Sequence, residues 1–174
     1  MTLHPRRTAP EEADIGGGAM PYASSSQMLM PIALRWALVW EAAPAPEASL
    51  WLCRATPRSW LVAGQQALAV KDAATSFGRL SFSIEVQAAC SAGCGGGHCA
   101  VATIGLNRTA GHGLPSGGLV LRLRLPGRPP IKSAATGGGK TVPASWLNAS
   151  SETVTFPEAE LQKQTGSVEV VVCY

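Results

Sequence analysis

The chain has 174 residues, a net charge of +3, and 14% charged and 46% hydrophobic residues, with 19 glycines and 13 prolines. This length suits one ordinary domain, and so many glycines and prolines favour short strands joined by turns over long helices. The basic residues occur mostly singly, without interleaved aromatic residues, which argues against a nucleic-acid partner. No apolar run approaches the roughly 18 residues that a membrane-spanning helix needs, so we expect no membrane span.

The first part of the chain has little to bury. Residues 1–27 contain three prolines, a glycine triplet and a serine triplet, a composition that predicts a disordered tail. The first apolar run follows the acidic pair Glu11-Glu12, where a signal peptide would carry basic residues. We therefore expect a disordered tail over 1–27, no signal peptide, and a single β-sandwich domain over 28–174.

The segment Met28–Trp40 fits two patterns. Leucine and alanine recur in it at helical spacing, whereas Arg35–Trp40 alternates and is rich in strand formers, so we favour a strand there after a helical turn. A second strand is predicted at Leu50–Ala55, as the other arm of a hairpin. Pro57–Leu61 is predicted to be one helical turn with Thr56 as its N-cap.

The clearest strand signal is the strict alternation in Leu119–Leu125. Its four leucines point to one face and Val120, Arg122 and Arg124 to the other, as expected when one side of a sheet is buried. Further strand-like stretches are Ala67–Val70, Leu80–Val86, Ala100–Leu106, Ile131–Ala135, Ala144–Leu147, Thr153–Phe156 and Val168–Tyr174. Short strands punctuated by turns predict an all-β fold, an antiparallel β-sandwich of roughly eight to ten short strands.

A cysteine-rich loop interrupts this pattern. Three thiolates at Cys90, Cys94 and Cys99, with the imidazole of His98, could hold zinc and support a zinc-dependent enzyme. The spacing matches no common zinc module, and neighbouring side chains bind one ion poorly, so we favour a plain inserted loop, with a local disulfide as an alternative. Five cysteines cannot all pair, and Cys53 is expected to be a small core residue. We assign no metal ligand and no cofactor.

The run Gly137-Gly138-Gly139-Lys140-Thr141 resembles the end of a phosphate-binding loop. The full pattern requires a glycine at position 134, which is alanine, and a helix directly afterwards, where Pro143 stands instead. We therefore predict a widened hairpin turn.

No set of residues for catalysis stands out. His4, His98 and His112 lie in contexts that do not suggest a general base. Paired carboxylates for glycoside hydrolysis could come from several acidic residues, which we interpret as ordinary strand-face or turn residues. These residues are Glu41, Asp72, Glu85, Glu152 and Glu158. We assign no catalytic residue and expect that the chain by itself is not an enzyme.

Two further features bear on glycans. Tryptophans can stack on sugar rings, but their positions suit a core equally well, and we favour core packing for most of them. They are Trp36, Trp40, Trp51, Trp60 and Trp146. Asn107-Arg108-Thr109 and Asn148-Ala149-Ser150 are N-glycosylation sequons, which have meaning only in a secreted protein.

Two segments carry a family resemblance: Leu50-Trp51-Leu52-Cys53-Arg54-Ala55-Thr56-Pro57-Arg58-Ser59-Trp60-Leu61 and Val70-Lys71-Asp72-Ala73-Ala74-Thr75-Ser76-Phe77-Gly78. They resemble the C-terminal β-sandwich module of large glycoside-hydrolase-like proteins whose catalytic domain is an (α/α)6 toroid, the six-hairpin glycosidase type. Leu119–Leu125, Pro130–Ser133 and Thr153–Phe156 are similar to the closing strands of that module. The resemblance covers residues 35–174.

The resemblance implies a non-catalytic accessory module that packs against a catalytic domain, contacts glycan, and works in an extracellular or secretory compartment. Cys90–Cys99 departs from the family as an insertion in a tight hairpin, and Thr136–Lys140 replaces a short Asn-Gly-Lys-like turn. The toroid precedes this module in such proteins, and the chain is too short to contain it, so no catalytic residue is carried over. The alternative is a small adhesion-type β-sandwich that binds a protein partner.

Overall fold

The computed structural model describes residues 25–42, 48–90, 94, 97–108, 113–163 and 166–174. The chain divides into two units, residues 1–36 and 37–174. The predicted disordered tail therefore lies outside the described residues as far as residue 24, and its last three residues begin a helix.

Helix α2 (Ser25–Leu38) replaces most of the strand that we predicted at Arg35–Trp40. The strand begins only at Val39. Leucine, methionine, alanine and arginine make up most of the segment and are good helix formers, and the helix forms even though Pro31 lies inside it. Several large apolar side chains of the helix are exposed: Leu29, Met30, Ile32, Leu34 and Trp36. No helix in the described part of the chain is long and apolar enough to cross a membrane.

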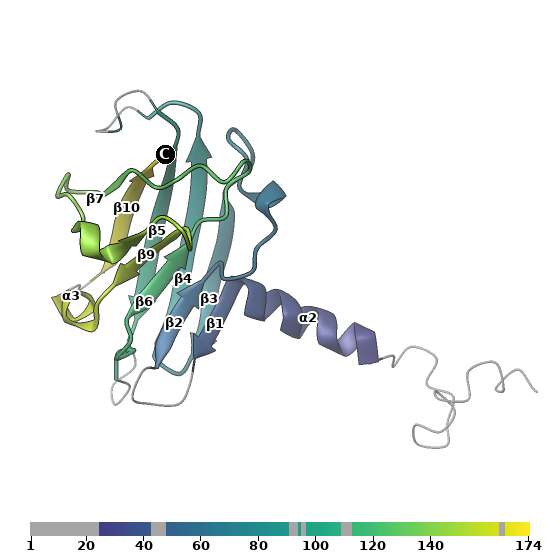
Figure 1. Cartoon of the computed structure of the whole chain (residues 1–174). Coiled ribbons are helices and arrows are strands. Elements are labelled where there is room, and N and C mark those ends of the chain that lie inside the picture. The colour runs from purple at the N-terminus through teal and green to yellow at the C-terminus, as the bar shows by residue number, and fades with distance from the viewer. Residues whose placement is uncertain (1–24, 43–47, 91–93, 95–96, 109–112, 164–165) are drawn as a thin grey trace, which may run out of the picture. The chain divides into compact units, whose positions relative to one another are not determined.

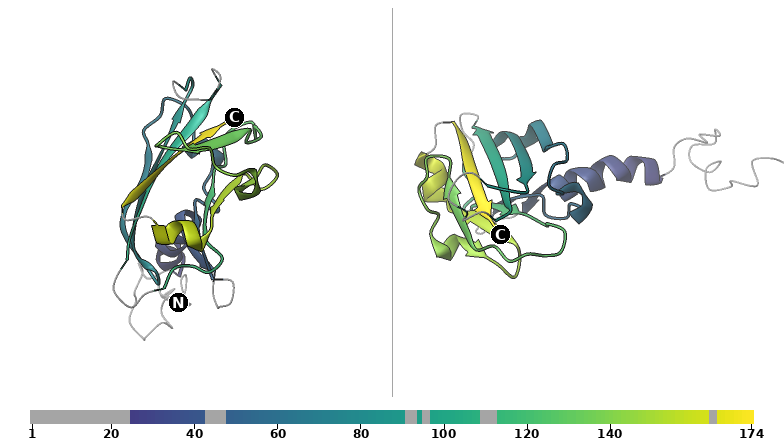
Figure 2. Two further views of the ribbon diagram at one scale, coloured as in Figure 1. Left: turned by 90° about the vertical axis from the view of Figure 1, so that its left-hand side faces the viewer. Right: turned by 90° about the horizontal axis from the view of Figure 1, so that it is seen from above.

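Residues 37–174 form a sandwich of two five-stranded sheets, which confirms the predicted all-β fold (Figures 1 and 2). Sheet A contains, in spatial order, β1 (Val39–Ala42), β2 (Ser49–Leu52), β6 (Leu119–Arg122), β9 (Thr153–Phe156) and β8 (Leu147–Asn148). Sheet B contains β3 (Leu68–Thr75), β4 (Gly78–Gln87), β5 (Cys99–Asn107), β10 (Ser167–Cys173) and β7 (Ser133–Thr136). The described pairs are antiparallel except β2 with β6, which run parallel.

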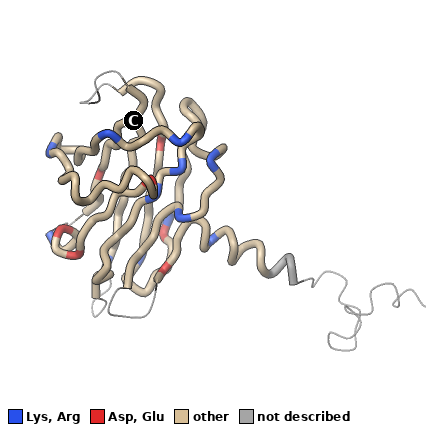
Figure 3. Tube along the Cα trace, in the orientation of Figure 1, with Lys and Arg blue, Asp and Glu red and all other residues tan. Residues whose placement is uncertain are grey.

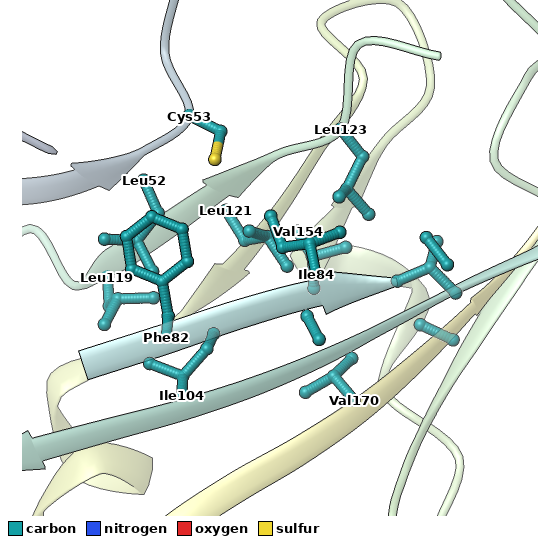
Figure 4. Close-up of a cluster of buried hydrophobic side chains, with 14 of the residues drawn as sticks. Leu52, Cys53, Phe82, Ile84, Ile104, Leu119, Leu121, Leu123, Val154 and Val170 are labelled. Atoms are coloured by element: carbon teal, nitrogen blue, oxygen red, sulfur yellow. The ribbon is translucent and has the colours of Figure 1, made fainter. Parts of the chain in front are cut away.

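The core lies between the two sheets. Leu119, Leu121, Leu123 and Leu125 are all at most 4% exposed, as their alternation predicts. In Figure 4 the labelled side chains of this stripe point toward those of sheet B, including Phe82, Ile84, Ile104 and Val170. The regular strand is shorter than predicted and ends at Arg122, although the leucines beyond it still point inward. The alternation therefore predicted the buried face correctly and the strand end incorrectly, and Val120, which it placed on the opposite face, is buried as well.

Among the described residues, three short helical segments connect the strands: η2 (Arg58–Trp60), η3 (Ala144–Trp146) and α3 (Glu158–Lys163). The first confirms the predicted helical turn, but the expected cap is wrong, because the Thr56 hydroxyl donates to the carbonyl oxygen of Cys53 instead. The second corrects the predicted strand at Ala144–Leu147, where only Leu147 belongs to a strand. The sequence reasoning did not predict α3.

The cysteine loop is held by disulfides rather than being a plain insertion. Cys90 is bonded to Cys99 within the loop, and Cys94 is bonded to Cys173 of β10. All three sulfur atoms considered for zinc are therefore used in disulfides, which corrects that alternative. Cys53 is the free thiol, fully buried as predicted, and burial raises its pKa to about 12. Such a thiol is unreactive while the fold is intact.

The thiol pattern gives a first prediction. With a disulfide-exchange dye, the native protein should show no reaction of Cys53, and the unfolded but unreduced protein should show one thiol. Full reduction should raise the count to five. More than one thiol in the unfolded, unreduced protein, isolated from an oxidising environment, would contradict the disulfide assignment.

Leu123→Asp should unfold the sandwich. The side chain of Leu123 is 1% exposed, so the substitution buries a charge without a partner and should cost roughly 4 kcal/mol or more. Chemical denaturation measures the loss. Val62→Asp is the matched control, because Val62 is 36% exposed and its substitution should leave the transition nearly unchanged.

Candidate functional site

None of the five tryptophans belongs to the buried core, which corrects the prediction that most of them pack there. Trp36 on α2 and Trp60 on η2 are exposed. Trp40 on β1, Trp51 on β2 and Trp146 on η3 are half-buried. Leucine, isoleucine, valine, alanine and two phenylalanines fill most of the space between the sheets. All five indoles therefore lie at least partly at the protein surface.

Trp40 and Trp51 lie side by side on the outward face of sheet A. They are cross-strand partners, and their neighbours Val39 and Leu52 are buried, so the alternation of the strands turns both indoles outward. The guanidinium carbon of Arg54 lies 4.7 Å from the ring centre of Trp40 and 6.0 Å from that of Trp51. This cation–π contact engages both rings within the chain itself.

Trp146 instead lines a pocket of about 480 Å³ between the two sheets. Buried residues of both sheets form its apolar floor, with Ile104 from sheet B and Leu119 and Phe156 from sheet A. The Trp146 ring meets Phe156 edge to face, with 6.1 Å between ring centres. The volume and the apolar lining are those of sites for small organic ligands.

The glycine run forms one side of the rim of this pocket. Gly139 N donates to Thr136 O and Thr136 N donates to Lys140 O, so the run is a hairpin turn, as predicted, and the helix that a phosphate loop requires does not follow it. The turn lies against β10, because Gly137 N donates to Glu169 O over 2.8 Å. A Cβ on Gly137 would lie 2.8 Å from the Glu169 Cβ, so this position requires glycine.

The edge of β10 forms another side of the pocket rim. β7 pairs with β10 only from Val170 to Cys173, while β10 begins at Ser167 and pairs with β5 on its other side. Within the described residues, the first residues of β10 have a neighbouring strand on one side only, apart from the bond from Gly137 to Glu169, and these residues line the pocket. The pocket thus offers backbone polar groups beside its apolar floor.

The charged side chains of the lining are Lys140 from the turn, Glu160 from α3 and Glu169 from β10. The Lys163 ammonium donates to Glu160 over 2.6 Å, and this bond, together with the charge of Lys140, lowers the pKa of the Glu160 carboxyl below its ordinary value. Glu160 is therefore ionised at neutral pH and unsuited to act as a general acid. The rim of the pocket therefore carries both positively and negatively charged groups that can form hydrogen bonds.

None of the carboxylates named in the sequence analysis lines this pocket. Four of them lie at the surface or half-buried, and each has a hydrogen-bond or ion-pair partner: Glu41, Asp72, Glu85 and Glu158. Of the histidines, His98 is exposed, and His4 and His112 lie outside the described residues. Among the described residues, no three His, Cys, Asp or Glu side chains gather where they could hold a metal ion.

Glu152 is the exception, because it is buried and paired. Arg58 donates from its two terminal nitrogens to the two Glu152 oxygens, over 2.6 and 2.8 Å, and one of these nitrogens also donates to the carbonyl oxygen of Leu125. The hydrogen bonds from Arg58 lower the pKa of the Glu152 carboxyl. This pair spans 94 positions in sequence, which is why periodicity could not reveal it.

Two more arginines stand beside this pair. Arg122 donates to the carbonyl oxygen of Arg54, and Arg124 donates to that of Thr56, so both hold the segment that leads into η2. Burial, and then the charge of Arg124, lower the pKa of Arg122. Basic residues gather around this segment in Figure 3. Arg122 and Arg124, which the alternation places on the face opposite the leucines, therefore hold a connection of the fold in place.

Comparison of the chain with protein-family models, with curated proteins and with solved structures gives no match. The candidate site therefore stands on its own geometry. The sequence reasoning named one member of the site, Trp146, as a sugar-stacking candidate, and it missed Lys140, Glu160 and Glu169 as lining residues. The sequence indicated the turn at Gly137–Thr141, but it did not indicate that this turn would lie against β10 beside a pocket.

The Arg58–Glu152 pair gives a third prediction. Glu152→Gln should lower the free energy of unfolding at pH 7 by about 1.5–3 kcal/mol, the range for hydrogen bonds to charged groups. Because the native pKa of Glu152 is depressed, its contribution is complete above the ordinary pKa of 4.5 and declines as the pH falls through the native value.

Urea titrations of both proteins between pH 7 and pH 2 measure this difference, which should shrink in acid. Glu85→Gln, at an exposed carboxylate, is the matched control and should change stability by less than about 0.5 kcal/mol. A difference between wild type and Glu152→Gln that stays constant with pH would contradict the role given to the ionised carboxylate.

Proposed function

We propose that the chain is a non-catalytic β-sandwich module of a carbohydrate-active, glycoside-hydrolase-like protein, and that it binds glycan in the pocket beside Trp146. The observation that carries the proposal is the composition of this pocket: an indole and an apolar floor beside hydrogen-bonding groups. Sugars combine apolar ring faces with hydroxyl groups, and such a lining matches both. The resemblance of residues 35–174 to the accessory module of toroid-type proteins points in the same direction.

The charges of the lining favour a neutral glycan. One lysine and two glutamates leave no excess of positive charge for a uronic acid or a sulfated sugar. Carboxylates, backbone carbonyls and the Lys140 ammonium suit hydroxyl groups, which both donate and accept hydrogen bonds. A volume of about 480 Å³ suits one or two sugar rings rather than a long chain.

The second part of the proposal is packing against a catalytic domain. It is supported by the apolar side chains that α2 exposes, among them Met30 at 71% and Leu29 at 56% exposure. Exposed apolar side chains that lie close together mark surfaces that become buried in a larger assembly. In proteins that the chain resembles, the domain available for this contact is the catalytic toroid.

An adhesion-type module that binds a protein partner is the second candidate. The observation that favours it is the outward face of sheet A, where two half-buried indoles and the exposed Arg54 stand together. Tryptophan and arginine are the residues that most often dominate the energetics of protein interfaces.

The pocket is tested by screening the protein on an array of neutral glycans and titrating the best ligand calorimetrically. Trp146→Ala should weaken binding roughly tenfold or more, because it removes the stacking surface. Lys140→Ala, at an exposed rim position that the core does not need, should weaken binding without changing the thermal transition. Trp60→Ala is the matched control: it removes an exposed indole outside the pocket and should leave affinity unchanged.

Equal losses in Trp60→Ala and Trp146→Ala would contradict a site in this pocket. Binding of a purified protein partner that Arg54→Ala abolishes, with no glycan bound, would favour the adhesion module. Polysaccharide hydrolysis by the chain alone, with product formed in proportion to protein, would overturn the non-catalytic assignment.

A further inference from the structure

The sequon Asn148-Ala149-Ser150 lies at the free edge of sheet A. In the part of the chain that the structure describes, β8 is the last strand of that sheet and pairs only with β9, through Leu147 and Asn148. All three residues of the sequon are exposed, and the chain turns directly after Asn148. An acceptor sequon in an exposed turn at a sheet edge leaves room for a bulky, hydrated glycan.

The side chain of Asn148 is held by its oxygen. Asn148 Oδ1 accepts a hydrogen bond of 2.7 Å from the Ser150 hydroxyl and one of 3.1 Å from Ser151 N. These two donors fix which end of the amide faces the turn, so the Nδ2 end points away from it. Nδ2 is the atom to which an N-linked glycan is joined, and the sequon serine already contacts the same amide.

The disulfides indicate in which compartment the protein folds, which a sequon alone does not. Cys90–Cys99 and Cys94–Cys173 together use four of the five cysteines. Two such bonds form and persist in oxidising surroundings, of which the lumen of the secretory pathway is the one where asparagine is also glycosylated. The sequon therefore has the setting that its chemistry requires.

We propose that Asn148 carries an N-linked glycan. In the transfer, Nδ2 forms a bond to C1 of an oligosaccharide donated by a lipid-linked pyrophosphate. The bond from C1 to the pyrophosphate oxygen breaks, the lipid pyrophosphate leaves, and Nδ2 loses one proton to the transferase. This inference does not depend on the glycan pocket, because Asn148 does not line it.

A glycan at this place would also protect the fold. An exposed edge strand offers unpaired backbone groups to other chains, and natural sheets cover or charge such edges. β8 has a free side, and neither Leu147 nor Asn148 provides a charge there. A hydrated oligosaccharide on Asn148 would cover this side.

The second sequon, Asn107-Arg108-Thr109, has to be removed before Asn148 can be tested alone. Asn107 ends β5 in the interior of sheet B, opposite Arg79, and Thr109 lies outside the described residues. The experiment is therefore run in the Asn107→Gln background, so that every glycan detected must come from Asn148.

The test translates the full chain, behind a signal sequence, in the presence of endoplasmic-reticulum microsomes, and scores only protease-protected, translocated chains. The Asn107→Gln chain should shift in mass, and glycan-releasing amidase should reverse the shift and convert Asn148 to aspartate. Asn148→Gln and Ser150→Ala in the same background should abolish the shift. Ser150→Thr, which retains a sequon, should keep it.

Translocated Asn107→Gln chains without the shift would overturn the proposal, as would a shift that survives Ser150→Ala. Because only translocated chains are scored, misfolding of a variant does not obscure the result. A second readout is aggregation of the secreted protein after enzymatic removal of the glycan, which should increase relative to the untreated protein. An unchanged monomer fraction would refute the protective role of the glycan. The mass shift alone decides whether Asn148 is modified.

Discussion

Burial of the leucine stripe of β6 between the two sheets is the constraint on which the rest of the structure depends. Leu119 and Leu121 are at most 1% exposed and lie in the middle strand of sheet A, paired with β2 on one side and β9 on the other. Because side chains of a strand alternate, fixing these leucines inward fixes the facing of both neighbours. The same alternation turns Trp51 and Arg122 outward. There the Trp51 ring lies near the Arg54 guanidinium, and Arg122 donates to the carbonyl oxygen of Arg54.

Two kinds of long-range contact then fasten the ends of the sandwich. The Arg58–Glu152 pair joins the segment after β2 to the residue before β9, next to the point where the leucine stripe leaves the regular strand. On sheet B, Cys94–Cys173 joins the loop before β5 to the end of β10. Both contacts close long stretches of chain, so in the unfolded state each would cost considerable entropy to form. They depend on the sheets already being in register.

The sequence predicted the parts of this structure that local periodicity determines. The alternation at Leu80–Val86 and Leu119–Leu125 identified the core faces, and the turn at Gly137–Thr141 followed from glycine chemistry. Contacts between distant segments were beyond its reach: the Cys94–Cys173 bond and the burial of Glu152 both depend on which strands become neighbours. Only part of the site was predicted: Trp146 was a candidate for sugar stacking, but the pocket that it lines is formed by residues of both sheets. The strand predicted at Arg35–Trp40 was wrong because alternation and helical spacing coexist there, and periodicity alone does not separate the two.

The pocket exists because the edge strands are short. β7 stops at Thr136 and β8 comprises two residues, so neither sheet has a full-length strand at this edge to cover the side chains of Ile104 and Leu119. A longer β7 would continue along β10 and fill the space; instead Gly137 lets the chain turn back in contact with Glu169. The turn and α3 bring polar groups to the rim of what would otherwise be core. The candidate site thus lies where the regular strand pattern ends, which is where local rules of sequence are expected to give way to function.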